Sequence, residues 1–215
     1  MGGLGPLPRV GREVSVFAVV PVKNLAEAKS RLSASLDLEE RGVLTLTLLK
    51  NVLAALRGVG SIDRVAVVSP SRRALSLAEE VDATALLQES RGLNEALEEG
   101  RRWALDEGAS ALLVLPADLP YLSASDVQML LEALNDTAVS AVISPDRLRE
   151  GTNALLLRPP DALQFVFGSG SFEAHLRGAR ERGIQVEIRE TVGVAFDLDT
   201  REDLRSLREP RVPRR

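Results

Sequence analysis

The sequence predicts an α/β fold in which helices flank a mixed, mostly parallel β-sheet. Short apolar runs rich in Val, Leu and Ile alternate along the chain with longer segments of helical periodicity. Apolar runs without polar alternation are typical of strands covered on both faces. Strands that alternate with helices form βαβ units, in which the strands are parallel. The expected strands are residues 14–20, 62–69, 111–116, 138–144 and 153–158.

Helical segments lie between these runs and carry recognisable ends. Residues 37–57 begin with Asp37 and a pair of glutamates and end before Gly58, and residues 93–107 end before Gly108. A third helix begins at Ser123, which together with Asp126 forms a capping box. The segment VPVKNLAEAKSRL after the first strand is also expected to enter a helix.

The length of 215 residues predicts one domain, which we place at residues 14–208. Residues 1–13 and 209–215 are expected to be loosely ordered termini. No apolar run is long enough to span a bilayer, and the N-terminal segment lacks the apolar centre of a signal peptide. We therefore expect a cytoplasmic protein that does not contact membranes.

The residue types that are rare or missing limit the possible chemistry. The chain has no cysteine and a single histidine, which excludes thiolate nucleophiles, Cys-ligated metal and His-rich metal sites. A bound metal must then be a hard cation with oxygen ligands, such as Mg²⁺ or Mn²⁺. The net charge of −4 argues against a broad nucleic-acid surface.

Three aspartates are candidate ligands for such a cation. Asp118 follows the expected strand 111–116 and is flanked by two prolines, whereas Asp197 and Asp199 follow the apolar stretch VGVAF. If that stretch is a strand, residues two apart point to the same side, so both carboxylates face one spot. The alternatives are that Asp118 stabilises a turn and that Asp199 caps a following helix.

Lysine is scarce, which makes its positions informative. Of 27 basic residues only three are lysines, and two of them, Lys23 and Lys29, lie in VPVKNLAEAKSRL. The start of a helix after the first strand of an α/β fold is a common phosphate site. Lys23, Lys29 and Arg31 are therefore candidates to neutralise a polyphosphate. The alternative is a solvated helix with Glu27 and Arg31 as an ion pair.

Two glycine-bearing segments are candidates for anion binding through backbone N–H groups. The first places Gly151 before Thr152, and the second places Gly168 and Gly170 before Ser171 and a helix. RGLNEAL (91–97) is a further helix entry, able to lie against a base or ribose. We interpret His175 as a surface or partly buried histidine rather than a catalytic one.

Taken together, these segments resemble the guanylyltransferases that make the nucleotide-activated precursor of the deazaflavin coenzyme F(420). The family comprises 2-phospho-L-lactate guanylyltransferases in archaea and phosphoenolpyruvate guanylyltransferases in bacteria. The segments that carry the resemblance are VPVKNLAEAKSRL, RGLNEAL, LPADLPYL, GTNALLLRPP, FGSGSFEAH and FDLDT.

The resemblance implies a Rossmann-like nucleotide-diphospho-sugar transferase fold and assigns roles to the candidates. It implies that Asp118, Asp197 and Asp199 hold Mg²⁺, and that Thr152, Gly168 and Ser171 receive the carboxylate of the acceptor. It also implies that Gly92, Leu93 and Asn94 lie toward the guanine nucleotide. The chain departs from the family at residues 148–150, which are Leu148, Arg149 and Glu150. The family pattern leads us to expect smaller or glycine-rich residues at these positions.

The expected reaction is attack by the acceptor's phosphate on the α-phosphorus of GTP, with release of pyrophosphate. Asp118 acts through the metal, while Lys23, Lys29 and Arg31 hold the β- and γ-phosphates. The phosphate nucleophile is already ionised at neutral pH, so the reaction needs no general base. The expected partners are GTP and a small phosphorylated carboxylic acid.

Several alternatives remain open from the sequence. The acceptor is phosphoenolpyruvate, 2-phospho-L-lactate or 3-phospho-D-glycerate, or, in a related nucleotidyltransferase, a sugar phosphate or molybdopterin. A catalytically silent nucleotide sensor is an alternative of another class. A receiver domain is disfavoured because Lys23 stands where receivers place acidic residues. The oligomeric state is open, with a homodimer as one alternative.

Overall fold

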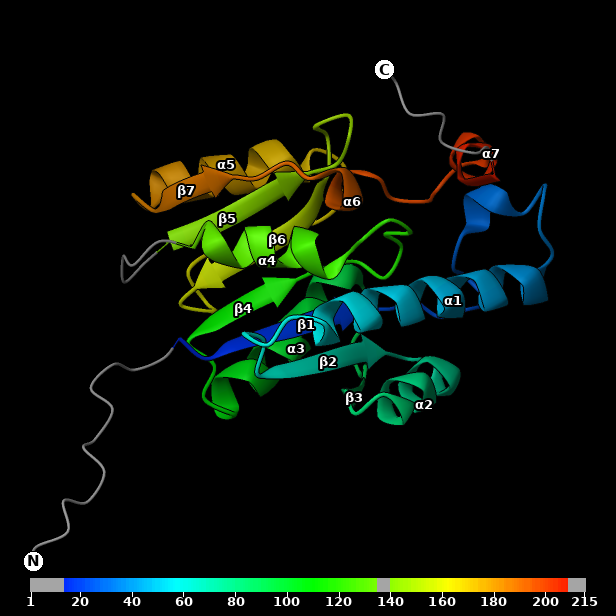
Figure 1. The fold of residues 1–215 in the computed structure, drawn as a ribbon, viewed down its shortest axis with the longest axis horizontal. Helices are drawn as coiled ribbons and strands as arrows, with labels where there is room; N and C mark the ends of the chain where they lie inside the picture. The colour runs from blue at the N-terminus through cyan, green and yellow to red at the C-terminus, as the bar shows by residue number, and fades with distance from the viewer. Residues whose placement is uncertain (1–13, 135–139, 209–215) are drawn as a thin grey trace, which may run out of the picture.

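The computed structural model describes residues 14–134 and 140–208. The terminal segments that we expect to be loosely ordered lie outside the described residues, as do the first two residues of the expected strand 138–144. Seven strands form one sheet in the order β3-β2-β1-β4-β6-β5-β7 (Figure 1). The strands are β1 (Val16–Pro21), β2 (Arg64–Ser69), β3 (Thr84–Leu87), β4 (Ala111–Val114), β5 (Ser140–Pro145), β6 (Thr152–Arg158) and β7 (Gln185–Ile188).

The sheet is mixed and mostly parallel, which confirms the predicted fold class. Strands β1, β2, β3 and β4 pair in parallel, as do β5 and β7. Strand β6 runs antiparallel to both of its neighbours, β4 and β5. Consequently the carboxyl ends of β1, β4 and β5 meet the beginning of β6 at one edge of the sheet.

Helices cover both faces of the sheet (Figure 1). Their bounds are α1 (Leu38–Arg57), α2 (Arg72–Glu80), α3 (Leu93–Asp106), α4 (Ala124–Glu132), α5 (Ser171–Glu181), α6 (Val192–Ala195) and α7 (Arg201–Arg208). Residues from α1, α2, α4 and α6 pack on one face, and residues from α3 and α5 pack on the other. None of the helices among the described residues is long and apolar enough to cross a membrane.

Strand β1 shows why the central strands are apolar on both sides. Val16, Ala18 and Val20 belong to the core under α1, whereas Phe17 and Val19 belong to the core under α3. Successive residues of a strand point to opposite faces, so a strand between two helical layers needs apolar residues at every position.

Local capping explains where the predicted helices begin. Asp37 and Glu40 form a capping box at the start of α1, and Ser123 and Asp126 form one at the start of α4. The helix predicted at 93–107 is α3, which packs closely on the sheet. A Cβ atom at Gly100 would lie 2.6 Å from the Val19 side chain, so glycine permits this close approach.

The segment that follows β1 is not the helix that we predicted. It contains turns and a single 3₁₀ turn, Ser30–Leu32. Asn24 folds the chain locally, because its carbonyl accepts the N–H groups of Glu27 and Ala28. Lys29 then adopts a left-handed conformation, with φ 52° and ψ 37°, which interrupts an α-helix. Glu27 and Arg31 are therefore not an i,i+4 pair on an α-helix.

The apolar stretch before Asp197 is also not a strand. Residues Val192–Ala195 form the short helix α6, in which the Thr191 hydroxyl accepts a hydrogen bond from the Val194 N–H at 3.2 Å. The chain then continues without regular structure through Asp197 and Asp199. The argument that a strand directs both carboxylates to one spot is therefore wrong.

The direction of β6 decides which of its ends faces the site. Ligands of α/β sheets bind beyond the carboxyl ends of parallel strands, a rule that would place residues 159–161 near the site if β6 were parallel. Because β6 is antiparallel, its carboxyl end lies at the opposite edge of the sheet. The beginning of β6, with Thr152 and Asn153, takes this place in the site.

Candidate active site

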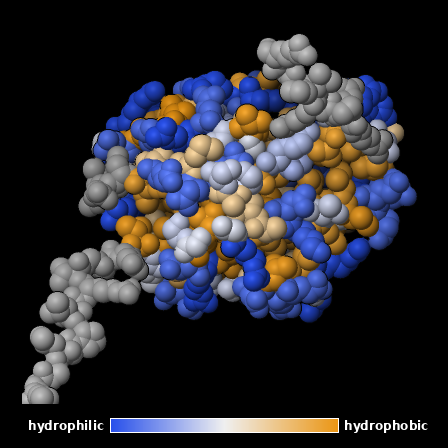
Figure 2. Space-filling view, in the orientation of Figure 1, coloured by the Kyte–Doolittle hydropathy of each residue, from blue (hydrophilic) through white to orange (hydrophobic). Residues whose placement is uncertain are grey.

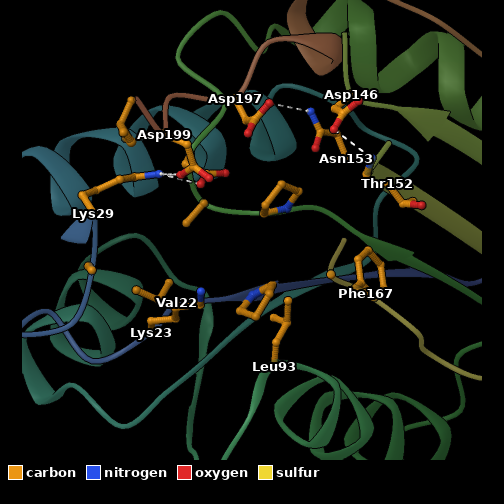
Figure 3. Close-up of a pocket in the computed structure, with 18 of the residues that line it drawn as sticks. Val22, Lys23, Lys29, Leu93, Asp146, Thr152, Asn153, Phe167, Asp197 and Asp199 are labelled. Carbon is orange, nitrogen blue, oxygen red and sulfur yellow. Dashed lines mark hydrogen bonds and ion pairs between the residues drawn. The ribbon is translucent and has the colours of Figure 1, made fainter. Parts of the chain in front are cut away.

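A pocket of about 290 Å³ opens at the edge of the sheet where β1, β4 and β5 end and β6 begins (Figure 3). Most of the candidate residues line it: Lys23, Leu93, Lys29, Asp118, Thr152, Gly168, Ser171, Asp197 and Asp199. These residues come from segments far apart in sequence, which the strand order brings together.

Lys29 forms the centre of the charged part of the pocket. Its ammonium nitrogen lies 2.6 Å from an oxygen of Asp118 and 2.9 Å from an oxygen of Asp199, and its side chain is 6% exposed. Burial alone would lower the pKa of Lys29, but the charges and hydrogen bonds of the two aspartates raise the pKa above 10.5. The left-handed backbone at Lys29 costs energy, as is frequent at functional sites.

Backbone contacts hold the two acidic loops beside each other. The Leu198 N–H donates to the carbonyl of Asp118 at 3.0 Å. Asp203 accepts hydrogen bonds from the N–H groups of Asp199 and Thr200, and so fixes the loop at the start of α7. The carboxylate of Asp199 therefore points to Lys29, while Thr200 accepts the hydrogen bond from the Asp203 N–H.

Asp197 is directed elsewhere. It accepts a long hydrogen bond of 3.4 Å from the side-chain amide of Asn153 (Figure 3). The same amide donates to the carbonyl of Val194 at 2.9 Å. Burial, and next the charge of Asp118, raise the pKa of Asp197 above its ordinary value of 3.8. The negative charge of Asp118 thus acts on the carboxylate of Asp197. Lys29, the partner of Asp118, bonds to Asp199 and not to Asp197.

The three aspartates do not form a ready-made metal site. Within residues 14–134 and 140–208, no three carboxylate or imidazole side chains lie in an arrangement that holds a metal ion. Two of the expected ligands, Asp118 and Asp199, do converge, but on the ammonium of Lys29. The predicted convergence of all three is therefore not present in this structure.

The donor set nevertheless fits a hard divalent cation. Four carboxylates line the pocket against two ammonium groups, which leaves an excess of negative charge. Such a pocket repels anionic ligands unless further cations enter with them. Carboxylate oxygens are the donors that Mg²⁺ prefers. The chemistry of the lining thus suits an anion that binds together with a divalent ion.

The opposite side of the pocket is neutral and tightly hydrogen-bonded. The Ser171 hydroxyl accepts the Thr152 N–H at 2.9 Å, and the Thr152 hydroxyl lies 3.0 Å from a ring nitrogen of His175. Gly168 and Gly170 have positive φ angles of 132° and 72°, which glycine adopts without strain. The Ser171 N–H donates to the carbonyl of Gly168. This N–H, one of the backbone groups expected to bind an anion, therefore already has a partner within the protein.

The unusual residues 148–150 are accommodated by Asp146. Its two carboxylate oxygens accept hydrogen bonds from the N–H groups of Leu148, Glu150 and Gly151. The Glu150 carbonyl in turn accepts the N–H of Phe172 in α5. This loop is thus held in place by one carboxylate, and the departure from the family pattern leaves Gly151 and Thr152 at the pocket.

A second pocket of about 540 Å³ adjoins the first. It contains Gly92, and it shares Lys23 and Leu93 with the first pocket. Gly92 has a φ of 111°, and a Cβ there would lie 2.0 Å from the carboxylate of Glu95. The adjoining pockets give an elongated space with Lys23 at their junction.

Two predicted site residues lie outside these pockets. Arg31 is 74% exposed and is 3.8 Å from Asp199, at the rim. The side-chain amide of Asn94 makes two hydrogen bonds with the backbone of Phe167. Its nitrogen donates to the Phe167 carbonyl at 3.2 Å, and its oxygen accepts from the Phe167 N–H at 2.8 Å. The side chain of Asn94 thus connects α3 to the loop on the other side of the pocket.

Sequence reasoning missed Asp146, Asn153 and Phe167, which also line the pocket. Asp146 follows an expected strand, and the general position rule for α/β sheets would have included it. Asn153 could not be predicted as a site residue, because it lies at the amino end of β6 and only the antiparallel direction of this strand brings that end to the site. Nothing in the sequence around Phe167 distinguishes a pocket residue from a core residue.

Comparison with known proteins identifies relatives over nearly the whole chain. Residues 16–208 match the family model described as "Guanylyl transferase CofC like". A phosphoenolpyruvate guanylyltransferase of Rubrobacter xylanophilus is 58% identical over 194 residues, which are 90% of this chain and 94% of the relative. Its counterpart from Sphaerobacter thermophilus is 45% identical over 194 residues, 90% of this chain and 93% of the relative.

Solved structures share the fold at much lower identity. A protein of Desulfovibrio desulfuricans G20 described as a nucleotide-diphospho-sugar transferase has a TM-score of 0.72 at 18% identity, covering 89% of this chain and 85% of that one. A glucosyl-3-phosphoglycerate synthase of Mycobacterium tuberculosis, in a complex with Mn²⁺ and UDP, has a TM-score of 0.60 at 14% identity, covering 82% and 70%. These similarities establish the fold.

Proposed function

Since the chain belongs to the family of CofC-like guanylyl transferases, we propose that it transfers GMP from GTP to phosphoenolpyruvate and releases pyrophosphate. The product, enolpyruvoyl-diphospho-guanosine, is a precursor of the deazaflavin coenzyme F(420). The choice of acceptor follows the names of the two bacterial relatives at 58% and 45% identity. GTP and phosphoenolpyruvate are cytoplasmic metabolites, and we place the reaction there, in a monomer or a homodimer.

One observation carries the proposal most strongly. Two adjoining pockets share Lys23 and Leu93, and the inner pocket has a charged side and a side of neutral hydroxyl groups. The second pocket of about 540 Å³, which we call the outer pocket, contains Gly92 and Leu93 and suits the nucleoside part of GTP. The first pocket of about 290 Å³ is the inner pocket. The inner pocket suits the reacting phosphates and the acceptor, whose carboxylate we assign to Thr152, Gly168 and Ser171.

In the proposed reaction a phosphate oxygen of the acceptor attacks the α-phosphorus of GTP. A new P–O bond forms, and the bond between the α-phosphorus and the oxygen that bridges to the β-phosphate breaks, so that pyrophosphate leaves. A phosphate monoester has its second pKa at about 6 and is already ionised at neutral pH. The chain therefore needs no general base, and its task is to bring two anions together.

We assign Asp118 and Asp199, with Asp197, as the ligands of Mg²⁺. Bound there, the ion would offset the charge of the phosphates and polarise the α-phosphate. Lys29, which bonds to two of these carboxylates in this structure, would then be available to a phosphate oxygen. Lys23 at the junction of the pockets and Arg31 at the rim neutralise the departing pyrophosphate.

The test is an assay of pyrophosphate release from purified protein with Mg²⁺. GTP with phosphoenolpyruvate should give pyrophosphate and a product whose mass is that of the GMP adduct, whereas CTP should give little. Parallel reactions with 2-phospho-L-lactate and 3-phospho-D-glycerate rank the acceptors by kcat/KM. Absence of pyrophosphate with every acceptor would favour the silent nucleotide sensor and contradict the proposed function.

A further inference from the structure

His175 is nearly inaccessible, yet one nitrogen of its ring contacts Thr152 in the pocket wall and the other contacts the backbone of Val166. It is 1% exposed and lies on α5. Nε2 is 3.2 Å from the backbone nitrogen of Val166, and Nδ1 is 3.0 Å from the Thr152 hydroxyl oxygen. The Phe167 ring contacts the imidazole edge-on, with 4.9 Å between the ring centroids.

These contacts determine which nitrogen carries the proton. A backbone N–H can only donate, so Nε2 of His175 must accept the hydrogen bond from Val166. Burial lowers the pKa of His175 from 6.5 to about 4, so the ring is neutral at physiological pH and has one proton. That proton is on Nδ1, so Nδ1 cannot accept from the Thr152 hydroxyl, and the hydrogen bond between them runs from His175 to the Thr152 oxygen. The ring also has a hydrogen bond with the backbone of Ser171, which raises the pKa of His175 but does not outweigh burial.

The direction of this hydrogen bond decides what Thr152 offers to the pocket. Its oxygen accepts from His175, so its own hydroxyl proton must point away from the ring. Thr152 lines the pocket, on the same side as Phe167 (Figure 3). The Ser171 oxygen likewise accepts from inside the protein, from the Thr152 N–H. Both hydroxyls are thereby left as donors, which suit an anionic oxygen.

We propose that His175 is a positioning residue that holds the Thr152 hydroxyl as a hydrogen-bond donor to an anionic oxygen of the acceptor substrate. The role of this donor in turnover rests on the proposed function, whereas its orientation rests on the hydrogen bonds alone. A histidine that served only the core would support stability, and its replacement would leave the affinity for the acceptor unchanged.

The orientation can be measured without any substrate. His175 is the single histidine of the chain, so in protein prepared without a histidine tag the ring ¹⁵N resonances need no assignment. Their chemical shifts distinguish a protonated from an unprotonated nitrogen. We expect the proton on Nδ1 at pH 7, with the ring staying neutral to about pH 4. A proton on Nε2, or a doubly protonated ring at pH 7, overturns the proposal.

Two substitutions separate the contacts of the ring in turnover assays. His175→Gln retains an acceptor for the Val166 N–H but loses the donor to Thr152, and we expect its KM for the acceptor to rise roughly tenfold at an unchanged KM for GTP. His175→Asn retains an amide donor near Thr152 and should restore much of the affinity. The opposite pattern, with Asn impaired and Gln normal, assigns the effect to the Val166 loop and overturns the proposal.

A double-mutant cycle tests whether His175 acts through Thr152. In a Thr152→Val background, His175→Gln should cause no further rise in the KM for the acceptor. Additive effects in the double variant contradict the proposal. Arg182→Ala is the matched control, since it removes a hydrogen bond to the carbonyl of Ala162 in the same loop without contacting Thr152. If wild-type protein releases no pyrophosphate, the proposed function fails, and the ring spectrum still decides the orientation.

Discussion

The two sides of the pocket are built by different interactions. We call Lys29, Asp118 and Asp199 the charged wall, and Thr152, Ser171 and His175 the hydroxyl wall. The charged wall is held by ion pairs between residues 89 and 170 positions apart in sequence. The hydroxyl wall is held by directional hydrogen bonds between residues 19 and 23 positions apart.

This difference indicates how each wall works. Ion pairs have weak directional demands, so Lys29 can exchange its carboxylate partners for a phosphate when other cations arrive. A buried hydrogen-bond network has one favourable arrangement and is costly to disrupt. We infer that the charged wall rearranges during the reaction and that the hydroxyl wall is formed before the substrate binds.

The largest effect is expected for Asp118→Asn. The substitution removes one charge from the charged wall and one proposed ligand of Mg²⁺ at nearly constant shape, and kcat/KM should fall by about 10³-fold or more. The measurement is pyrophosphate release, with circular dichroism to verify the fold. Asp106→Asn, an exposed residue at the end of α3, is the matched control. Normal turnover in Asp118→Asn would contradict the assignment of this residue.

Lys29→Met should reduce turnover by about 10²-fold, because it removes a cation from the phosphates. Its effect on stability is more informative. Asp118 and Asp199 lose their shared partner, so Mg²⁺ should raise the melting temperature of this variant more than that of the wild type. Lys50→Met, at an exposed position of α1, serves as the control. An equal response to Mg²⁺ in all three proteins would show that Lys29 does not compete for these carboxylates.

The hydroxyl wall should depend on pH through His175. The folded state lowers the pKa of His175 to about 4, so the unfolded chain takes up a proton at a higher pH, near 6.5. The stability from the neutral ring is therefore complete above pH 6.5 and is lost as the pH falls toward 4. The loss between pH 7 and pH 4 should be about 3 kcal/mol in the free energy of unfolding.

Urea unfolding at both pH values measures this loss. Carboxylates also titrate in this range, so the comparison is with His175→Gln, which lacks the imidazole but keeps all carboxylates. The wild type should lose about 3 kcal/mol more than the variant. Equal losses would mean that His175 can be protonated in the folded protein at little cost.

The smallest effect is expected for Asn94→Ala. Both hydrogen bonds to the Phe167 backbone disappear, and the loop next to the hydroxyl wall loosens. The KM for the acceptor should rise by up to about tenfold, while Asn51→Ala on the exposed face of α1 should have no effect. A rise in the KM for GTP alone would instead support the direct nucleotide contact that the sequence predicted for Asn94.

The elements that could be predicted from the sequence are those whose ends are determined locally. The capping boxes at Asp37 and Ser123 locate α1 and α4 within a residue or two, since each involves side chains three positions apart. The apolar pattern of β1 predicted burial on both faces, which its contacts with two cores confirm. Segments at the surface were harder to predict, because their hydropathy gives no clear pattern. On the face that Figure 2 shows, hydrophilic and hydrophobic residues are intermixed.

The two failures have different physical causes. The apolar pattern of residues 192–195 favours a strand, but these residues form a short helix that Thr191 caps. Lys29 interrupts a helix-like pattern with a left-handed backbone, while its side chain reaches two distant carboxylates. In each case contacts with residues remote in sequence, or a single local cap, outweigh weak propensities.

The sequence by itself determined the chemical inventory: hard oxygen donors, scarce lysines near one strand end, one histidine, and a strand–helix alternation that specifies an α/β sheet. Such features depend on residue types and local spacing, which any single chain displays. Only the tertiary structure decided that β6 runs antiparallel and places Thr152 at the pocket, that Lys29 lies between two of the three aspartates, and that His175 directs a proton toward Thr152. Those outcomes depend on strand direction and hydrogen-bond geometry, because residues far apart in sequence meet only once the sheet has assembled.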